Sequence, residues 1–154
     1  MQMLTQETIL TQAVEAMNNS CSKTILVAED NKDSRAMLRF FLEDLGYKVI
    51  EVENGKKAVE AAIDFLPDLI LMDLNMPEMN GLAAAAEIRQ HAELREIPIL
   101  ANSSNGNNGI ELFLNVDKLG SGLVEYLPKP IELDELSALI KAIFKNIKIA
   151  PLQA

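Results

Sequence analysis

Hydrophobic and polar residues follow two alternating patterns from about residue 23 onward. Short runs rich in Val, Ile and Leu come first in each pair, and several of them are apolar on both faces. Such runs are typical of strands in a parallel sheet that helices cover on both sides. The predicted strands are residues 24–28, 48–52, 69–72, 97–101 and 124–127.

The segments that follow these strands carry apolar residues at helical spacing. Gly46 ends the first helical pattern and Pro67 ends the second, as expected for residues that stop helices. The fourth helix has the least defined start, because residues 102–109 are dense in Asn, Ser and Gly. The predicted helices cover about residues 38–45, 58–66, 82–91, 110–119 and 133–145.

Five strands alternating with five helices predict an α/β fold built around a doubly wound parallel sheet. The main domain is predicted over residues 23–147, with a short tail at 148–154. Residues 1–22 form an N-terminal extension whose apolar stripe is consistent with a short amphipathic helix. That extension is either a leader that rests against the domain or a helix for dimerisation or partner binding.

The charge balance narrows the class of partner. The 154 residues include 14 Lys+Arg and 23 Asp+Glu, giving a formal net charge of −9 with no basic stretch, which argues against direct nucleic-acid binding. No apolar run approaches the roughly 20 residues that span a bilayer, so no membrane partner is expected. There is no signal-like leader, and the single Cys21 cannot form an internal disulfide, so we expect a cytoplasmic protein.

Chemically useful side chains gather where the predicted strands end. Glu29 and Asp30 follow the first strand, Asp73 the third, Ser103 the fourth and Lys129 the fifth. In doubly wound sheets, ligands bind beyond the carboxyl ends of the strands, where the strand order reverses. Three carboxylates at that edge resist joint ionisation unless a cation lies among them, and Mg²⁺ is the simplest hard divalent ion for oxygen ligands.

This combination of groups suits phosphoryl transfer. A carboxylate can attack phosphorus and form an acyl phosphate when a metal and a lysine neutralise the phosphoryl oxygens. A hydroxyl such as that of Ser103 can then hydrogen-bond the transferred group, which carries about −1.5 to −2 charges.

Four stretches carry a family resemblance: Ile-Leu-Val-Ala-Glu-Asp-Asn at 25–31, Leu-Ile-Leu-Met-Asp-Leu-Asn-Met-Pro-Glu-Met-Asn-Gly at 69–81, Ile-Pro-Ile-Leu at 97–100 and Tyr-Leu-Pro-Lys-Pro at 126–130. In this order and spacing they resemble the receiver domain of two-component response regulators. The resemblance implies a flavodoxin-like (βα)5 sandwich of three layers, with five parallel strands in the order 2-1-3-4-5. It also implies a stand-alone, chemotaxis-type regulator, and Met1 favours a complete short protein over part of a hybrid kinase.

The resemblance assigns the phosphoacceptor and its metal. By it, Asp73 is the phosphoacceptor, and Asp30, Asp73 and the backbone carbonyl of Asn75 bind Mg²⁺. Glu29 assists through water.

The remaining roles concern the phosphoryl group and the switch. By the same resemblance, Lys129 contacts the phosphoryl group, Ser103 is the switch hydroxyl and Tyr126 is the switch aromatic. The Pro130 peptide is expected to be cis. A register slip of one residue would give the role of Ser103 to Ser104, and Tyr126 could instead be an ordinary half-buried strand aromatic.

Two features depart from the family pattern. Residues 102–104 read Asn-Ser-Ser, where similar domains mostly have an apolar residue, then Thr or Ser, then Ala. The 26 positions from Ser103 to Lys129 are also more than is usual. Either the output face is reshaped for an unusual partner, or the coupling between Ser103 and Tyr126 is weak.

The resemblance therefore implies a signalling switch rather than a metabolic enzyme. A histidine kinase or histidine phosphotransfer protein phosphorylates Asp73, and the product state shifts an equilibrium between two surfaces that a downstream protein reads. Self-phosphorylation and autodephosphorylation are the only activities expected, and a homodimer is left open.

Two other classes are alternatives. The first is a receiver-like docking module that no longer switches. The second is a haloacid-dehalogenase-like phosphohydrolase, which would need an acid at position 75, where this chain has Asn. The single histidine, His91, is interpreted as a surface residue.

Overall fold

The computed structural model describes residues 5–10, 22–103 and 124–146. Its central feature is a five-stranded sheet in which every neighbouring pair is parallel and the order is β2-β1-β3-β4-β5. This order confirms the predicted topology. The elements are β1 (Thr24–Ala28), α2 (Lys32–Asp44), β2 (Lys48–Val52), α3 (Gly55–Phe65), β3 (Leu69–Asp73), α4 (Gly81–Arg89), the 3₁₀ helix η1 (Ala92–Leu94), β4 (Ile99–Ser103), β5 (Val124–Pro128) and α6 (Leu133–Asn146).

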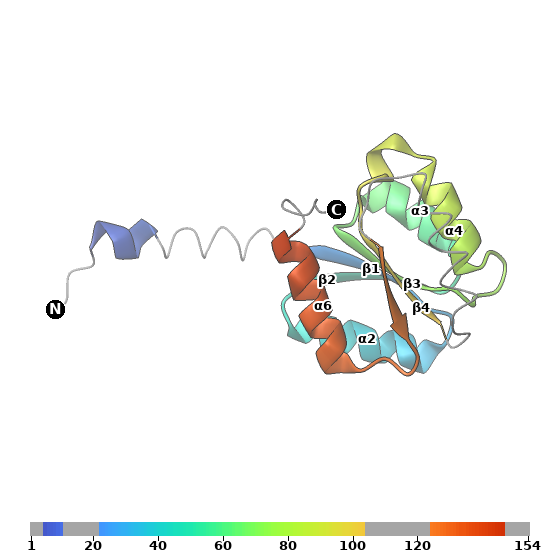
Figure 1. Ribbon diagram of the computed structural model, residues 1–154, viewed down its shortest axis with the longest axis horizontal. Helices are drawn as coiled ribbons and strands as arrows, with labels where there is room; N and C mark the ends of the chain where they lie inside the picture. The colour runs from blue at the N-terminus through green and yellow to red at the C-terminus, as the bar shows by residue number, and fades with distance from the viewer. Residues whose placement is uncertain (1–4, 11–21, 104–123, 147–154) are drawn as a thin grey trace.

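The sheet lies between two helical layers, with α2 and α6 on one side and α3 and α4 on the other (Figure 1). Alternate residues of β1 serve the two layers: Ile25 and Val27 pack toward α2 and α6, whereas Leu26 and Ala28 pack toward α3 and α4. The predicted three-layer sandwich is therefore confirmed in the part of the chain that the structure describes.

Several predicted boundaries were wrong: α2 begins at Lys32 rather than residue 38, and β4 ends at Ser103 rather than residue 101. β4 begins at Ile99 rather than residue 97, because Pro98 has no N–H to donate to the ladder and only its carbonyl takes part, accepting from the Ile70 N–H at 3.0 Å. The third helix ends at Arg89 rather than His91, where short-range hydrogen bonds of the 3₁₀ type replace the helical pattern before η1.

Three helices that follow strands begin in the same way. Asn31, Asn54 and Asn80 are the N-caps of α2, α3 and α4, and each side chain accepts a backbone N–H three residues later at 2.8 Å. These caps fix where each chain segment leaves the sheet edge and enters its helix.

Some predictions fall outside the described residues. The predicted fourth helix at 110–119 and Cys21 lie there. Of the predicted amphipathic extension, residues 6–10 are helical and 11–21 are not described. Among the described helices, none has the length and apolar character needed to cross a membrane.

Candidate functional site

Three carboxylates meet where β1 and β3 end. Glu29 and Asp30 follow β1 and Asp73 closes β3, and one oxygen from each carboxylate lies within 4.8 Å of the others. Glu29 and Asp73 are 2% and 1% exposed, whereas Asp30 is exposed. This group, called here the acid cluster, occupies the position that the strand-end argument predicted.

Lys129 reaches the acid cluster from the end of β5. Its Nζ lies 3.0 Å from Asp73 Oδ2 and 3.2 Å from Glu29 Oε1. The Lys129–Pro130 peptide is cis, as predicted. One ammonium beside three carboxylates leaves a net formal charge of −2, which one divalent cation would balance.

The pKa values of Glu29 and Lys129 both shift because these charged groups are partly buried and lie close together. Burial raises the pKa of Glu29; the Asn31 N–H bond to its carboxylate lowers that pKa, repulsion from Asp73 raises it further, and attraction to Lys129 lowers it. Burial alone would lower the pKa of Lys129, but its hydrogen bonds and attraction to Asp73 and Glu29 together outweigh burial and raise it.

The donor set fits a hard divalent cation. Carboxylate oxygens are the ligands that Mg²⁺ prefers, and two buried acids beside an exposed one leave a face open to water, which Mg²⁺ retains in most protein sites. Glu29, Asp30 and Asp73 are the described residues that could hold such an ion.

Asn75 connects the loop after Asp73 to β4. Its backbone N–H donates to Asp73 Oδ1 at 2.9 Å, and its side-chain Nδ2 donates to Ser103 Oγ at 2.9 Å. The structure therefore brings Asn75 into the predicted site, and its side chain makes a contact with the predicted switch hydroxyl that the sequence did not reveal.

Ser103 joins three parts of the site. It is 1% exposed, and its backbone carbonyl accepts both the Tyr126 hydroxyl at 2.9 Å and the Lys129 N–H at 3.3 Å. Tyr126 is half-buried and packs against the core on the α3 and α4 side. The two predicted switch residues thus share a hydrogen bond next to the backbone of the lysine that contacts Asp73.

Close backbone approach shapes the loop after Asp73. A Cβ on Gly81 would lie 2.3 Å from the Asp73 carbonyl oxygen, and one on Gly55 would lie 2.0 Å from the Met79 carbonyl oxygen. Only glycine fits at either position. Glu78, in the same loop, has a φ of 65°, an uncommon value for a non-glycine residue. The β3–α4 loop therefore packs closely against both the end of β3 and the start of α3.

Two residues at the site were not predicted as site residues, although Asn102 was noted as a departure from the family pattern. Asn102 is 1% exposed and pairs in register with Asp73, and its Oδ1 and Nδ2 have no hydrogen-bond partner among the described residues. The signal was an amide at a strand position that is usually apolar. Arg35 donates from Nη1 to the Glu29 carbonyl at 2.8 Å, and no pattern in the sequence singled it out.

His91 caps the start of η1 and is partly exposed, in line with its interpretation as a surface residue. His91 is not part of the acid cluster.

Comparison with known proteins gives relatives along most of the chain. Residues 25–141 match the response regulator receiver domain. The polar-differentiation response regulator DivK of Brucella anthropi is 33% identical over 121 residues, which cover 78% of this chain and 94% of that protein. Histidine kinase P4 of Formosa agariphila is 35% identical over 123 residues, which cover 80% of this chain but only 9% of the kinase.

Solved structures agree with the sequence relatives. The receiver domain of sensor histidine kinase PA1611 from Pseudomonas aeruginosa, which has a magnesium ion coordinated in its active-site cleft, matches with a TM-score of 0.70 and 33% identity over 79% of this chain and 96% of that one. A receiver domain of a histidine kinase from Syntrophus aciditrophicus matches with a TM-score of 0.73 and 27% identity over 86% and 98%. The chain belongs to the response regulator receiver domain family.

Proposed function

We propose that this chain is a Mg²⁺-dependent phosphoacceptor that takes a phosphoryl group on Asp73 from a histidine kinase or a histidine phosphotransfer protein. The observation that carries the proposal is a carboxylate only 1% exposed, 3.0 Å from an ammonium and within 4.8 Å of two further acids. Such a charge arrangement is costly to keep for stability alone, and it suits a nucleophile for phosphorus.

The step is a transfer between two covalent partners. An Asp73 carboxylate oxygen forms a bond to phosphorus as the P–N bond of the donor phosphohistidine breaks, and the released imidazole nitrogen takes up a proton. A bound Mg²⁺ supplies neutralisation of the phosphoryl oxygens. Lys129, already within 3.0 Å of Asp73, supplies a second positive charge at the same place. Asp30, Asp73 and the carbonyl of Asn75 would hold the cation, and Glu29 would assist through water.

The transferred group then offers a new acceptor to the Ser103 hydroxyl. That hydroxyl accepts from Asn75 Nδ2 at 2.9 Å before transfer, and a charged phosphoryl oxygen is a strong acceptor for its proton. Because the Ser103 carbonyl holds both the Tyr126 hydroxyl and the Lys129 N–H, a shift of Ser103 changes the surroundings of the aromatic ring. The outcome is a changed protein-interaction surface read by a downstream partner.

The relatives support this assignment. The Pseudomonas aeruginosa receiver holds magnesium in its cleft, DivK is a response regulator of similar length, and Histidine kinase P4 contains a similar segment. We infer the same metal, a kinase-type donor and a cytoplasmic setting for this chain. A role as a constitutive docking module is less well supported, because Asp73, Asp30 and Lys129 are all retained and placed together.

The test is incubation of the full chain with Mg²⁺ and acetyl phosphate, read by intact mass. We expect the wild type to gain one phosphoryl group and Asp73→Ala to gain none. Asp64→Ala is the matched control, because Asp64 is an exposed acid on α3. Equal uptake by Asp73→Ala, or none by the wild type, would contradict the assignment.

The switch is tested separately from the transfer. The chain has two tyrosines and no tryptophan, so Tyr47→Phe leaves Tyr126 as its only strong intrinsic fluorophore. We expect its emission to change when the phosphoryl group is added. Unchanged emission from a fully phosphorylated protein would favour the docking module.

A further inference from the structure

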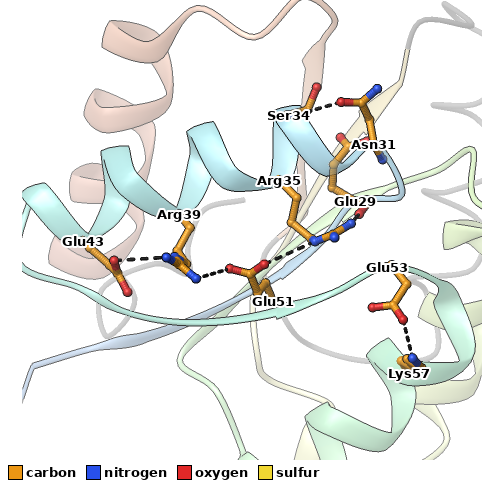
Figure 2. A network of polar contacts seen from close by, with 9 residues as sticks. All are labelled: Glu29, Asn31, Ser34, Arg35, Arg39, Glu43, Glu51, Glu53 and Lys57. Atoms are coloured by element: carbon orange, nitrogen blue, oxygen red, sulfur yellow. Dashed lines mark hydrogen bonds and ion pairs between the residues drawn. The ribbon is translucent and has the colours of Figure 1, made fainter.

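Arg35 joins the acid cluster to the edge of the sheet. It lies near the start of α2, and its side chain is 15% exposed. Its Nη1 donates to the Glu29 backbone carbonyl at 2.8 Å, while its Nε donates to Glu51 Oε1 on β2 at 3.3 Å (Figure 2). The guanidinium therefore spans the gap between the metal-site backbone and the edge strand.

The Glu29 carbonyl that Arg35 contacts determines how the backbone enters Asp30. It belongs to the peptide that joins Glu29 to Asp30, and because a peptide is planar, fixing its oxygen fixes the direction in which the chain enters Asp30. The Glu29 N–H donates to the Val52 carbonyl at 3.1 Å, so both backbone groups of Glu29 are tied to fixed partners. Asp30, in contrast, is exposed and lies between β1 and the N-cap Asn31.

Glu51 is itself held in place. Its second oxygen accepts from Arg39 Nη1 at 2.9 Å, and Arg39 Nε lies 3.7 Å from Glu43 Oε1 one helical turn later (Figure 2). We call Arg35, Arg39, Glu43 and Glu51 the β2 ion-pair network. Within it, Arg35 is the member that the structure bonds to Glu29.

We propose that Arg35, anchored by Glu51, is a positioning residue that orients the Glu29–Asp30 peptide so that the two acids bind a divalent cation. The proposal rests on the metal-dependent function proposed above. Two effects of Arg35 on Mg²⁺ have opposite signs. Its charge repels the cation, so removing it would tighten binding by charge alone, whereas loss of the peptide's orientation weakens binding. Glu51 offsets much of the charge, so the orientation effect dominates.

The experiment measures Mg²⁺ binding to the full chain by calorimetry, with no phosphodonor present. Arg35→Met should weaken Mg²⁺ affinity by about tenfold, in the range that partners of metal ligands typically contribute. Arg39→Met is the matched control: it removes a second guanidinium from the same Glu51 but no bond to Glu29, and should leave the affinity close to wild type. Glu51→Gln should fall between them.

Each outcome either supports or overturns the positioning role of Arg35. Unchanged or tighter binding in Arg35→Met, or equal weakening in Arg39→Met, would overturn the positioning role while leaving the proposed function standing. A wild type that binds no Mg²⁺ would overturn both. Thermal unfolding without metal shows that each variant is folded at the binding temperature. If Arg35→Met does not fold, Arg35→Lys keeps the charge but not the two-sided donor geometry, and weaker Mg²⁺ binding is again the expected result.

Discussion

The acid cluster and the β2 ion-pair network meet at the Glu29–Asp30 peptide, but the network is formally neutral and the cluster is negatively charged. The network contains two guanidinium groups and two carboxylates, so it is formally neutral, and its side chains are 15% to 48% exposed. The acid cluster with Lys129 has two excess negative charges, and two of its acids are almost fully buried.

This difference in charge and exposure matches the two roles proposed above, positioning for the β2 ion-pair network and phosphoryl transfer for the acid cluster. Exposed, balanced charges are screened by water and contribute little free energy, so they serve mainly to fix geometry. Buried, unbalanced charges interact strongly, because little solvent screens them, and under the function proposed above a cation would balance them. The same chain therefore uses ion pairs in two ways a few residues apart.

The largest expected effect is from removing Lys129, the cation that the structure places against Glu29 and Asp73. Lys129→Met leaves Glu29 and Asp73 buried without their partner, and losing one member of a buried pair costs about 3–5 kcal/mol. Because Lys129 is 29% exposed, we expect less than this, about 2–3 kcal/mol, in urea unfolding without metal. Saturating Mg²⁺ should restore part of the loss. A loss below about 1 kcal/mol without metal would contradict this picture.

A smaller and opposite effect is expected beside the acid cluster. Asn102→Val removes a buried amide that lacks a partner among the described residues and replaces it with a β-branched residue suited to a strand. We expect the free energy of unfolding to rise by about 1–2 kcal/mol, measured by urea unfolding. Leu100→Asn, on the same strand face, is the reciprocal variant and should destabilise. A decrease in stability for Asn102→Val would show that the amide is satisfied.

The pH dependence of the buried site follows from Glu29. Its raised pKa means that the folded protein holds this proton more tightly than the unfolded chain. Without metal, wild-type stability should therefore fall as pH rises from the ordinary value of 4.5 through the raised folded pKa. Glu29→Gln lacks this loss, so the stability difference between variant and wild type should grow over that window. Urea unfolding at several pH values in EDTA measures it, and a constant difference would contradict the assignment.

The smallest effect is expected on the exposed side of the comparison. Glu43→Gln removes one partner of the Arg39–Glu43 pair, whose side chains are 40% and 48% exposed and whose atoms are 3.7 Å apart. We expect a loss of about 0.3–0.5 kcal/mol or less in low salt, and none in high salt. A loss comparable to that of Lys129→Met would erase the distinction between the two regions.

Much of the fold could be predicted from the sequence, because both-face apolar strands alternate with amphipathic helices. The meeting of three acids is present in the structure, and so are the strand order and the cis Lys129–Pro130 peptide, which the family resemblance implied. The start of β4 was missed, because the apolar run continues through Pro98, which has no N–H and takes part only through its carbonyl. Periodicity likewise does not show where an α-helix tightens into a 3₁₀ turn, as it does after Arg89.

The site was predicted less completely than the fold. Strand-end chemistry located Glu29, Asp73 and Lys129, because parallel strands bring their carboxyl ends together. The contacts of Asn75 and Arg35 depend on side-chain direction and on a partner far along the chain, which spacing does not encode. Their roles were therefore visible only once the tertiary structure placed them.

The long-range pairing of β1 with β3 has a consequence for synthesis and folding. The first strand of the sheet pairs with β3, joining Ile25 to Leu69, and the Asp73–Lys129 contact links residues 56 positions apart. Parallel pairings of such range form late and slowly. A growing or truncated chain that lacks the end of β5 also lacks the Lys129 that contacts Asp73, so under the function proposed above it would not yet have a complete acceptor site.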